Sequence, residues 1–165
     1  MRKKDQTMKL HATANNLPAQ TRERSVQVLN QALADLSDLY SQAKQAHWNV
    51  RGPKFMMLHE LFDRVAGMVE EHLDAIAERL TALGGTAAGT VRMAAAASAL
   101  PEWPANLTSE DQFTRALTER FAKAANAVRA GIDTTAQAGD ADTADLLTTV
   151  SLDLDKALWF LEASA

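Results

Sequence analysis

Four segments of the chain carry apolar residues at intervals of three and four positions, the spacing that lines one face of an α-helix. They span about 19–50, 53–83 and 109–136, with the last beginning near Asp142 and Asp145. The last stripe is typical and contains Leu147, Val150, Leu154, Leu158 and Leu161. With only seven Gly and four Pro among 165 residues, this pattern predicts an all-α protein.

The connections between these segments predict how the helices are arranged. Gly52-Pro53 and Gly84-Gly85 end the first two helices, and Thr108 with Asp111 resembles a capping box before the third. The stretch 86–107 is long for a bundle connection, and its alanine-rich part, 94–97, is compatible with a short helix. We therefore expect a ferritin-like four-helix bundle of up-down-down-up type, with a short helix in the crossover between the second and third helices.

Composition limits the chemistry and the domain count. The chain has the size of one domain, expected over 17–165, while residues 1–16 lack apolar periodicity and read as a mobile basic tail. There is no cysteine, so any metal must bind imidazole and carboxylate groups, which suit iron, manganese or zinc. No apolar run reaches about 18 residues and no secretory signal is evident, so we expect a cytoplasmic protein without a membrane partner. The net charge of −4 excludes a globally basic surface for nucleic acid.

Two pairs of potential metal ligands fall on one face of the second helix. Taking His59 as zero, Asp63, Asp74 and Glu78 lie at about 40°, 60° and 100° around the helix axis. Asp63 and Asp74 are nevertheless roughly 16 Å apart along it, too far to share one ion. A second copy lying antiparallel across a two-fold axis near Met68 would bring His59 and Asp63 opposite Asp74 and Glu78. Gly67 near the crossing would permit close approach.

Simpler explanations exist for single residues in this stretch. His72 points away from the stripe and is more typical of a surface or core histidine than of a ligand. Asp74 and Glu78 could pair with Arg64, Arg79 or lysines on a solvated face. The whole set, with His47 continuing the inner stripe of the preceding helix, is costly to bury unless it binds a cation. We therefore favour a metal site.

The same residues carry a resemblance to a known family. The run from His47 to Gly52 (HWNVRG), then Leu58-His59 and Asp63, then Leu73 to Arg79 leading to Gly84, resembles the Dps family, or mini-ferritins. The segments 142–147, 154–156 and 158–162 look like the last helix of that family, so the similarity covers about 20–163. It implies an iron-oxidising centre at a two-fold interface, with ligands His47, His59 and Asp63 from one subunit and Asp74 and Glu78 from the other.

The resemblance also implies assembly and activity. A homo-oligomeric shell of twelve subunits would act as a ferroxidase, consuming iron(II) and hydrogen peroxide and storing iron(III) as a mineral, which protects DNA from oxidative damage. Asp140, Asp142 and Asp145 could line a pore by which iron enters, although Asp142 and Asp145 also suit a helix amino terminus.

One alternative remains open, and a second is disfavoured. The tail residues Arg2, Lys3, Lys4 and Lys9 could bind DNA non-specifically, in which case the protein would be a nucleoid-associated, DNA-compacting protein whose metal site is mainly structural. A larger ferritin of twenty-four subunits would place its ligands on Glu-x-x-His motifs within each bundle, and this chain has none.

Overall fold

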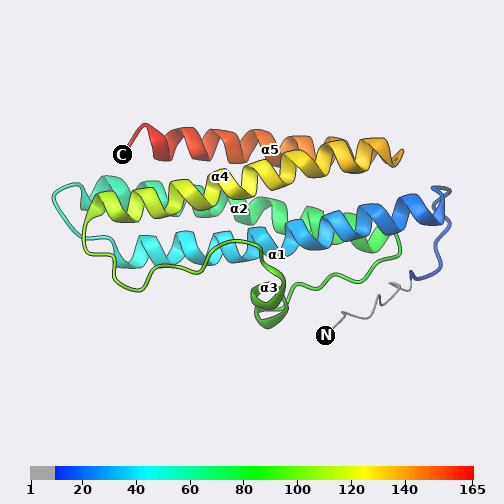
Figure 1. Cartoon of the computed structure of the whole chain (residues 1–165), viewed down its shortest axis with the longest axis horizontal. Helices are drawn as coiled ribbons and strands as arrows, with labels where there is room; N and C mark the ends of the chain where they lie inside the picture. The colour runs from blue at the N-terminus through cyan, green and yellow to red at the C-terminus, as the bar shows by residue number, and fades with distance from the viewer. Residues whose placement is uncertain (1–9) are drawn as a thin grey trace.

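The structure, a computed structural model, describes residues 10–165, which form five helices (Figure 1). The helices are α1 (Ala19–Asn49), α2 (Phe55–Ala82), α3 (Val91–Ala97), α4 (Glu110–Gln137) and α5 (Ala141–Glu162). Within 10–165 there is no β-strand. The predicted all-α class is therefore confirmed. None of these helices is long and apolar enough to cross a membrane.

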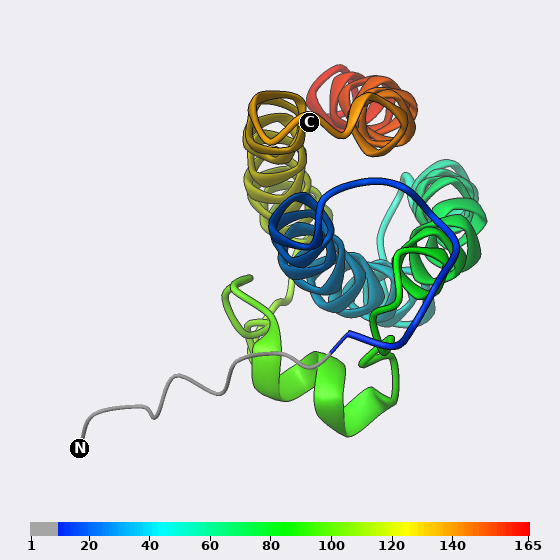
Figure 2. The same ribbon diagram turned by 90° about the vertical axis from the view of Figure 1, so that its right-hand side faces the viewer.

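Four long helices enclose the core, and α3 lies outside them. Seen end on, α1 packs beside α2 and α4, while α5 completes the bundle against α4 and α2 (Figure 2). Short connections make α1 antiparallel to α2 and α4 antiparallel to α5, whereas the long crossover returns the chain so that α2 and α4 run in the same direction (Figure 1). The core between them is closed by fully buried side chains that include Leu29, Leu36, Phe62, Phe121 and Leu154.

The crossover is held to the bundle by a buried arginine. Arg120 of α4 donates to Gln42 Oε1 of α1 at 2.6 Å and to the carbonyl oxygen of Glu102 in the crossover at 2.6 Å. Its guanidinium also lies 5.5 Å from the centre of the Trp103 ring. The short helix α3 begins at Val91 because the Thr90 hydroxyl caps it, accepting from Met93 N–H at 3.4 Å. It is thus longer than the alanine run suggested.

Two residues at the end of the predicted tail, Leu10 and His11, contact the bundle. Leu10 and Leu17 pack against the core, and His11 N–H donates to the carbonyl oxygen of Gly84 at 2.7 Å. The His11 ring also lies 3.2 Å from the Thr86 hydroxyl. Contacts made by such isolated residues produce no periodic pattern in the sequence. The predicted DNA-binding residues Arg2, Lys3, Lys4 and Lys9 lie outside the described residues.

The structure also corrects two helix caps. α4 begins with a capping box between Ser109 and Gln112, one residue later than predicted. α5 is capped by Asp140, whose side chain accepts from Thr143 N–H at 3.1 Å, and Asp142 lies in its first turn. The sequence placed Asp142 and Asp145 at this helix amino terminus, but the residue that caps it is Asp140, which precedes both.

Candidate metal centre

Two histidines face each other where α1 ends and α2 begins. His47 lies in the last turn of α1, and His59 lies in the second turn of α2. Each imidazole Nδ1 is 2.8 Å from the backbone carbonyl oxygen of the other histidine. The rings stack with their centres 3.7 Å apart and their planes inclined by 20°. The two helices therefore hold the two rings as one unit.

These contacts determine which ring nitrogen is available for a metal ion. A carbonyl oxygen only accepts hydrogen bonds, so both Nδ1 atoms must carry the proton. In the neutral rings Nε2 then keeps its lone pair, which is the form that binds metals. A backbone carbonyl on the far nitrogen is the usual partner that fixes the orientation of a ligating histidine.

Asp63 lies beside this pair but is held by a lysine. His47 Nε2 is 3.9 Å from Asp63 Oδ1, and Lys44 Nζ is 2.5 Å from the same oxygen. The hydrogen bond from Lys44 lowers the pKa of Asp63, and the positive charge of Lys44 acts in the same direction. The sequence reasoning missed Lys44, although its position one turn before His47 was a usable signal.

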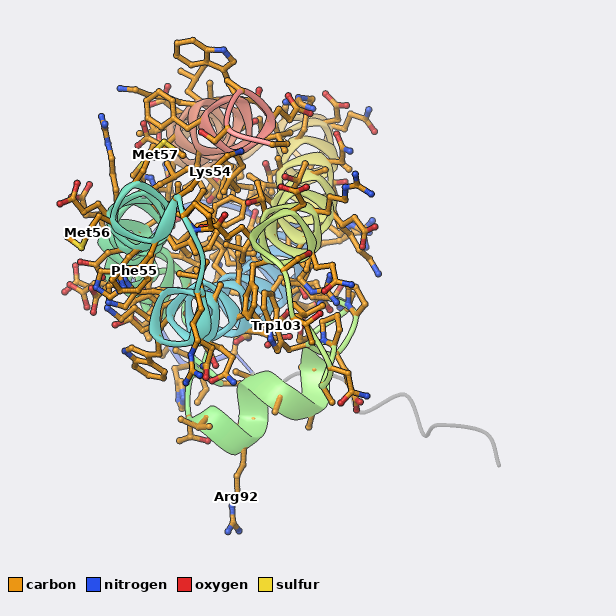
Figure 3. The ribbon with its side chains drawn as sticks, turned by 90° about the vertical axis from the view of Figure 1, so that its left-hand side faces the viewer. Lys54, Phe55, Met56, Met57, Arg92 and Trp103 are labelled. Atoms are coloured by element: carbon orange, nitrogen blue, oxygen red, sulfur yellow. The ribbon has the colours of Figure 1, made fainter. Side chains whose placement is uncertain are left out.

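The loop that brings the histidines together depends on a residue from α4. Glu110 Oε1 accepts from Lys54 N–H at 2.6 Å, at the amino end of α2. The Glu110 side chain fills the space beside Gly52, where φ is +148° and an added Cβ would overlap it. Figure 3 shows this end of the bundle, with Lys54 and Phe55 at the start of α2. No local pattern in the sequence connects Glu110 with this loop.

Asp74 and Glu78 lie on the same helix but away from the histidines. Both are exposed, and α2 runs uninterrupted from Asp63 to Glu78, so roughly 16 Å of helix separates Asp63 from Asp74. Among the ion pairs of residues 10–165, neither Asp74 nor Glu78 takes part. Within that range no three histidine, aspartate or glutamate side chains gather closely enough to hold a metal ion.

An open groove lies beside Asp74, where α2 meets α1 and the crossover. Its lining includes the apolar residues Leu33, Leu73, Ala77 and Ala87 and the polar residues Ser37, Glu70 and Thr90. Near the midpoint of α2, a Cβ added at Gly67 would meet nothing within 4 Å. This face could therefore accept another helix at close range.

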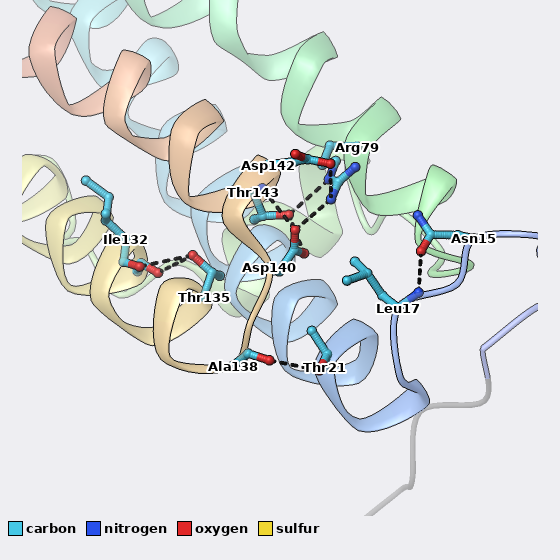
Figure 4. Close-up of polar contacts among 11 residues, drawn as sticks. Asn15, Leu17, Thr21, Arg79, Ile132, Thr135, Ala138, Asp140, Asp142 and Thr143 are labelled. Carbon is cyan, nitrogen blue, oxygen red and sulfur yellow. Dashed lines mark hydrogen bonds and ion pairs between the residues drawn. The ribbon is translucent and has the colours of Figure 1, made fainter.

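Arg79 is next to Glu78 in the sequence, but it pairs with aspartates at the amino end of α5. Its guanidinium lies 2.7 Å from Asp140 Oδ1 and 3.7 Å from Asp142 Oδ2, and its Nε donates to the Thr143 hydroxyl (Figure 4). Arg64, the other proposed partner of the acidic pair, lies instead over the Phe160 ring at 4.6 Å. The alternative in which these arginines neutralise Asp74 and Glu78 is therefore not the arrangement observed.

The candidate pore residues separate into two kinds. Asp140 is fully buried, and its carboxylate is bound by Arg79 and Thr143, so the proposal that it lines a pore is wrong. A helix cap and a buried ion pair account for this aspartate. Asp142 and Asp145 are exposed on the first turns of α5.

His72 lies on a different face of α2 from His59, Asp63, Asp74 and Glu78, as the helical periodicity predicts. It is buried between helices, and its Nε2 is 2.9 Å from Asp153 Oδ2 of α5. The contact joins α2 to α5 and leaves the His47 and His59 site unaffected.

Comparison with known proteins agrees with the fold and with the family resemblance. The model of the Ferritin family, described as a ferritin-like domain, matches residues 26–164. The chain is 43% identical over 156 residues to the "DNA protection during starvation protein" of Agrobacterium fabrum, covering 94% of this chain and 96% of the relative. Among solved structures, DpsC from Streptomyces coelicolor has a TM-score of 0.90 at 30% identity, covering 99% of this chain and 95% of that one. An archaeal Dps homologue from Halobacterium salinarum has a TM-score of 0.88 at 26% identity, covering 99% and 91%.

The bundle and the matched model define a ferritin-like protein. Within that class, the relatives and the solved structures show that the chain belongs to the Dps family.

Proposed function

We propose that the protein is a ferroxidase that oxidises iron(II) with hydrogen peroxide at a site shared between two copies of the chain. The observation that carries the proposal is the reciprocal His47 and His59 contact, which leaves both Nε2 lone pairs free, with that of His47 3.9 Å from Asp63 Oδ1. Asp74 and Glu78 of the second copy would complete the ligand set across a two-fold axis near Met68. The open groove beside Asp74 and the free space at Gly67 support that docking.

The chemistry follows from the donor set. Two imidazoles and three carboxylates bind iron(II), and carboxylate oxygens favour the iron(III) product. Few protein ligands leave coordination positions open for the oxidant. Two iron(II) ions each give up one electron, the O–O bond of peroxide breaks, and two protons complete two water molecules. The iron(III) would then be mineralised inside a homo-oligomeric shell, which we propose to contain twelve copies.

Removal of both reactants accounts for a protective role. Iron(II) and peroxide together generate hydroxyl radical, so their consumption would protect DNA without contact. Relatives of this chain are named for DNA protection during starvation. Asp142 and Asp145 remain candidates for the lining of a pore that attracts iron(II), since both are exposed acidic residues. We place this activity in the cytoplasm.

A second candidate function is non-specific DNA binding by the basic tail. Its support is the cluster of four positive charges within residues 1–9, which twelve copies would present together. In that case the protein would associate with the nucleoid. Phosphate contacts would then add to the oxidation chemistry rather than replace it.

The direct test is iron oxidation by the His59→Ala/Asp63→Ala variant. The variant should assemble as the parent does, because apolar residues such as Leu73 and Ala77 line the docking face. It should lose peroxide-dependent oxidation of iron(II), followed by the absorbance of iron(III). An unchanged oxidation rate would overturn the assignment of the site.

A further inference from the structure

Met56 lies on the same stripe of α2 as the proposed iron ligands. It precedes His59 by three residues and Asp63 by seven, which places these two within about 60° and 20° of Met56 around the axis. Phe55, its neighbour, has its ring 5.0 Å from the His59 ring. Along the axis, Met56 is only about 4.5 Å from His59.

Two other methionines provide internal comparisons. The exposed methionines among residues 10–165 are Met56 at 60%, Met57 at 50% and Met93 at 51%. Met57 is turned by about 100° from Met56, and Figure 3 shows the two side chains pointing in different directions. Met93 belongs to α3, outside the bundle. In the single chain, exposure is thus similar for all three residues, while proximity to the ligand stripe is not.

We propose that Met56 is a sulfoxidation site that consumes oxidant released at the iron site. The inference rests on the proposed function, because iron(II) and hydrogen peroxide must meet there. Methionine sulfoxide is the reversible product of thioether oxidation, and cellular reductases restore the thioether. Met56 would therefore protect His59 and its neighbours at the cost of a repairable change.

The reaction balances when a single iron(II) meets peroxide. Iron(II) gives one electron, the O–O bond breaks, and hydroxide and hydroxyl radical form. The radical adds to the Met56 sulfur, iron(III) takes back one electron, and loss of the hydroxyl proton to the hydroxide leaves sulfoxide and water. The net change is one thioether and one peroxide converted to one sulfoxide and one water, with iron(II) regenerated. Because hydroxyl radical reacts close to where it forms, the sulfur on the ligand stripe is the favoured target.

The experiment measures sulfoxide at each methionine by peptide mass spectrometry. The assembled protein is treated with peroxide alone, and in a second sample with peroxide and less than one iron(II) per chain. For each methionine, the sulfoxide yield with iron is divided by the yield without iron. That ratio removes differences in accessibility. We expect iron to raise the Met56 ratio at least five-fold above the ratios of Met57 and Met93. Equal ratios for the three residues would overturn the inference.

Two controls identify the source of the effect. Zinc in place of iron should give no increase, because zinc does not change oxidation state. The His59→Ala/Asp63→Ala variant should lose the iron-dependent increase at Met56 and keep the iron-free yield; a retained increase would mean that the oxidant does not arise at this site. Iron oxidation is followed in the same samples. Rapid oxidation with equal ratios refutes only the role of Met56, whereas absence of oxidation refutes the proposed function and this inference with it.

Discussion

Lys44 Nζ lies 2.5 Å from Asp63 Oδ1, so the lysine forms an ion pair with a carboxylate that we propose as an iron ligand. A cation arriving at the site must displace Lys44 or share the oxygen with it. Both outcomes weaken metal binding, because the lysine contributes competing positive charge beside the incoming ion. Lys44 is therefore expected to set the metal affinity of the site.

Replacement of Lys44 by methionine should strengthen metal binding. The Lys44→Met variant keeps the length of the side chain but removes its charge, so zinc, used as a probe that undergoes no redox change, should bind several-fold more tightly. Titration calorimetry at one pH measures the effect. Lys44→Arg is the matched control, and it should retain the weaker affinity of the parent. Equal affinities for Lys44→Met and the parent would show that the ion pair does not compete with metal.

The shared site makes a prediction about mixed assemblies. A chain carrying His59→Ala/Asp63→Ala and a chain carrying Asp74→Ala/Glu78→Ala each form homodimers with two incomplete sites. A mixed dimer would contain one intact site and one that lacks all four groups. Co-assembled variants should therefore recover peroxide-dependent oxidation of iron(II) that neither shows alone. Failure to recover it in verified mixed shells would exclude ligands from two chains.

Gly84 and Gly139 form a matched pair for testing how residues 10–17 dock. Both have positive φ, +88° and +86°, but a Cβ at Gly84 would lie 2.6 Å from the His11 carbonyl oxygen, whereas one at Gly139 would meet nothing within 4 Å. Gly139→Ala should cost only the backbone strain, about 1–2 kcal/mol of unfolding free energy. Gly84→Ala should cost more, and it should expose residues 10–17 to proteolysis. Equal losses in urea unfolding would show that the His11 contact contributes little.

The sequence predicted the helices well because their stripes are long and regular. The positions of His59, Asp63, Asp74 and Glu78 on one face follow directly from an uninterrupted α2. Contacts between distant segments were not predictable in this way. The hydrogen bond from Lys54 N–H to Glu110 is one example, because it depends on how α4 meets the loop after α1. The environment of Asp140 is another example. The sequence shows only an acidic residue before a helix, and that pattern is the same whether the residue lines a pore or is buried against Arg79.

The tail prediction concerns charge alone. Replacement of Arg2, Lys3, Lys4 and Lys9 by glutamine should reduce DNA association equally on all sequences and remove most of its salt dependence, because phosphate contacts carry no base information. Gel-shift titrations at several salt concentrations measure both effects. Iron oxidation should be unchanged, which serves as the control for folding and assembly. Normal DNA association by the altered protein would assign DNA binding to another surface.

Asp140 should make stability depend on pH in the acid range. Burial alone raises the pKa of Asp140, but the nearby Ser25 side chain, the hydrogen bonds from Thr143 and the charge of Arg79 together outweigh it, so the pKa lies below its usual value. A carboxyl group whose pKa is lowered by folding stabilises the native state above its unfolded pKa, about 3.9, and this contribution is lost as the pH falls through the folded value. Asp140→Asn should therefore cost about 3 kcal/mol at pH 7, where it leaves Arg79 without its buried partner.

The difference between parent and Asp140→Asn should shrink progressively below about pH 4, as the parent carboxylate is protonated. Urea unfolding of both proteins between pH 2.5 and pH 7 measures this convergence. Asp142→Asn is the matched control, because Asp142 is 83% exposed and lies 3.7 Å from the same guanidinium; its loss should be small at every pH. A constant difference between parent and Asp140→Asn across the range would mean that the charge of Asp140 is not what stabilises the junction of α2 and α5.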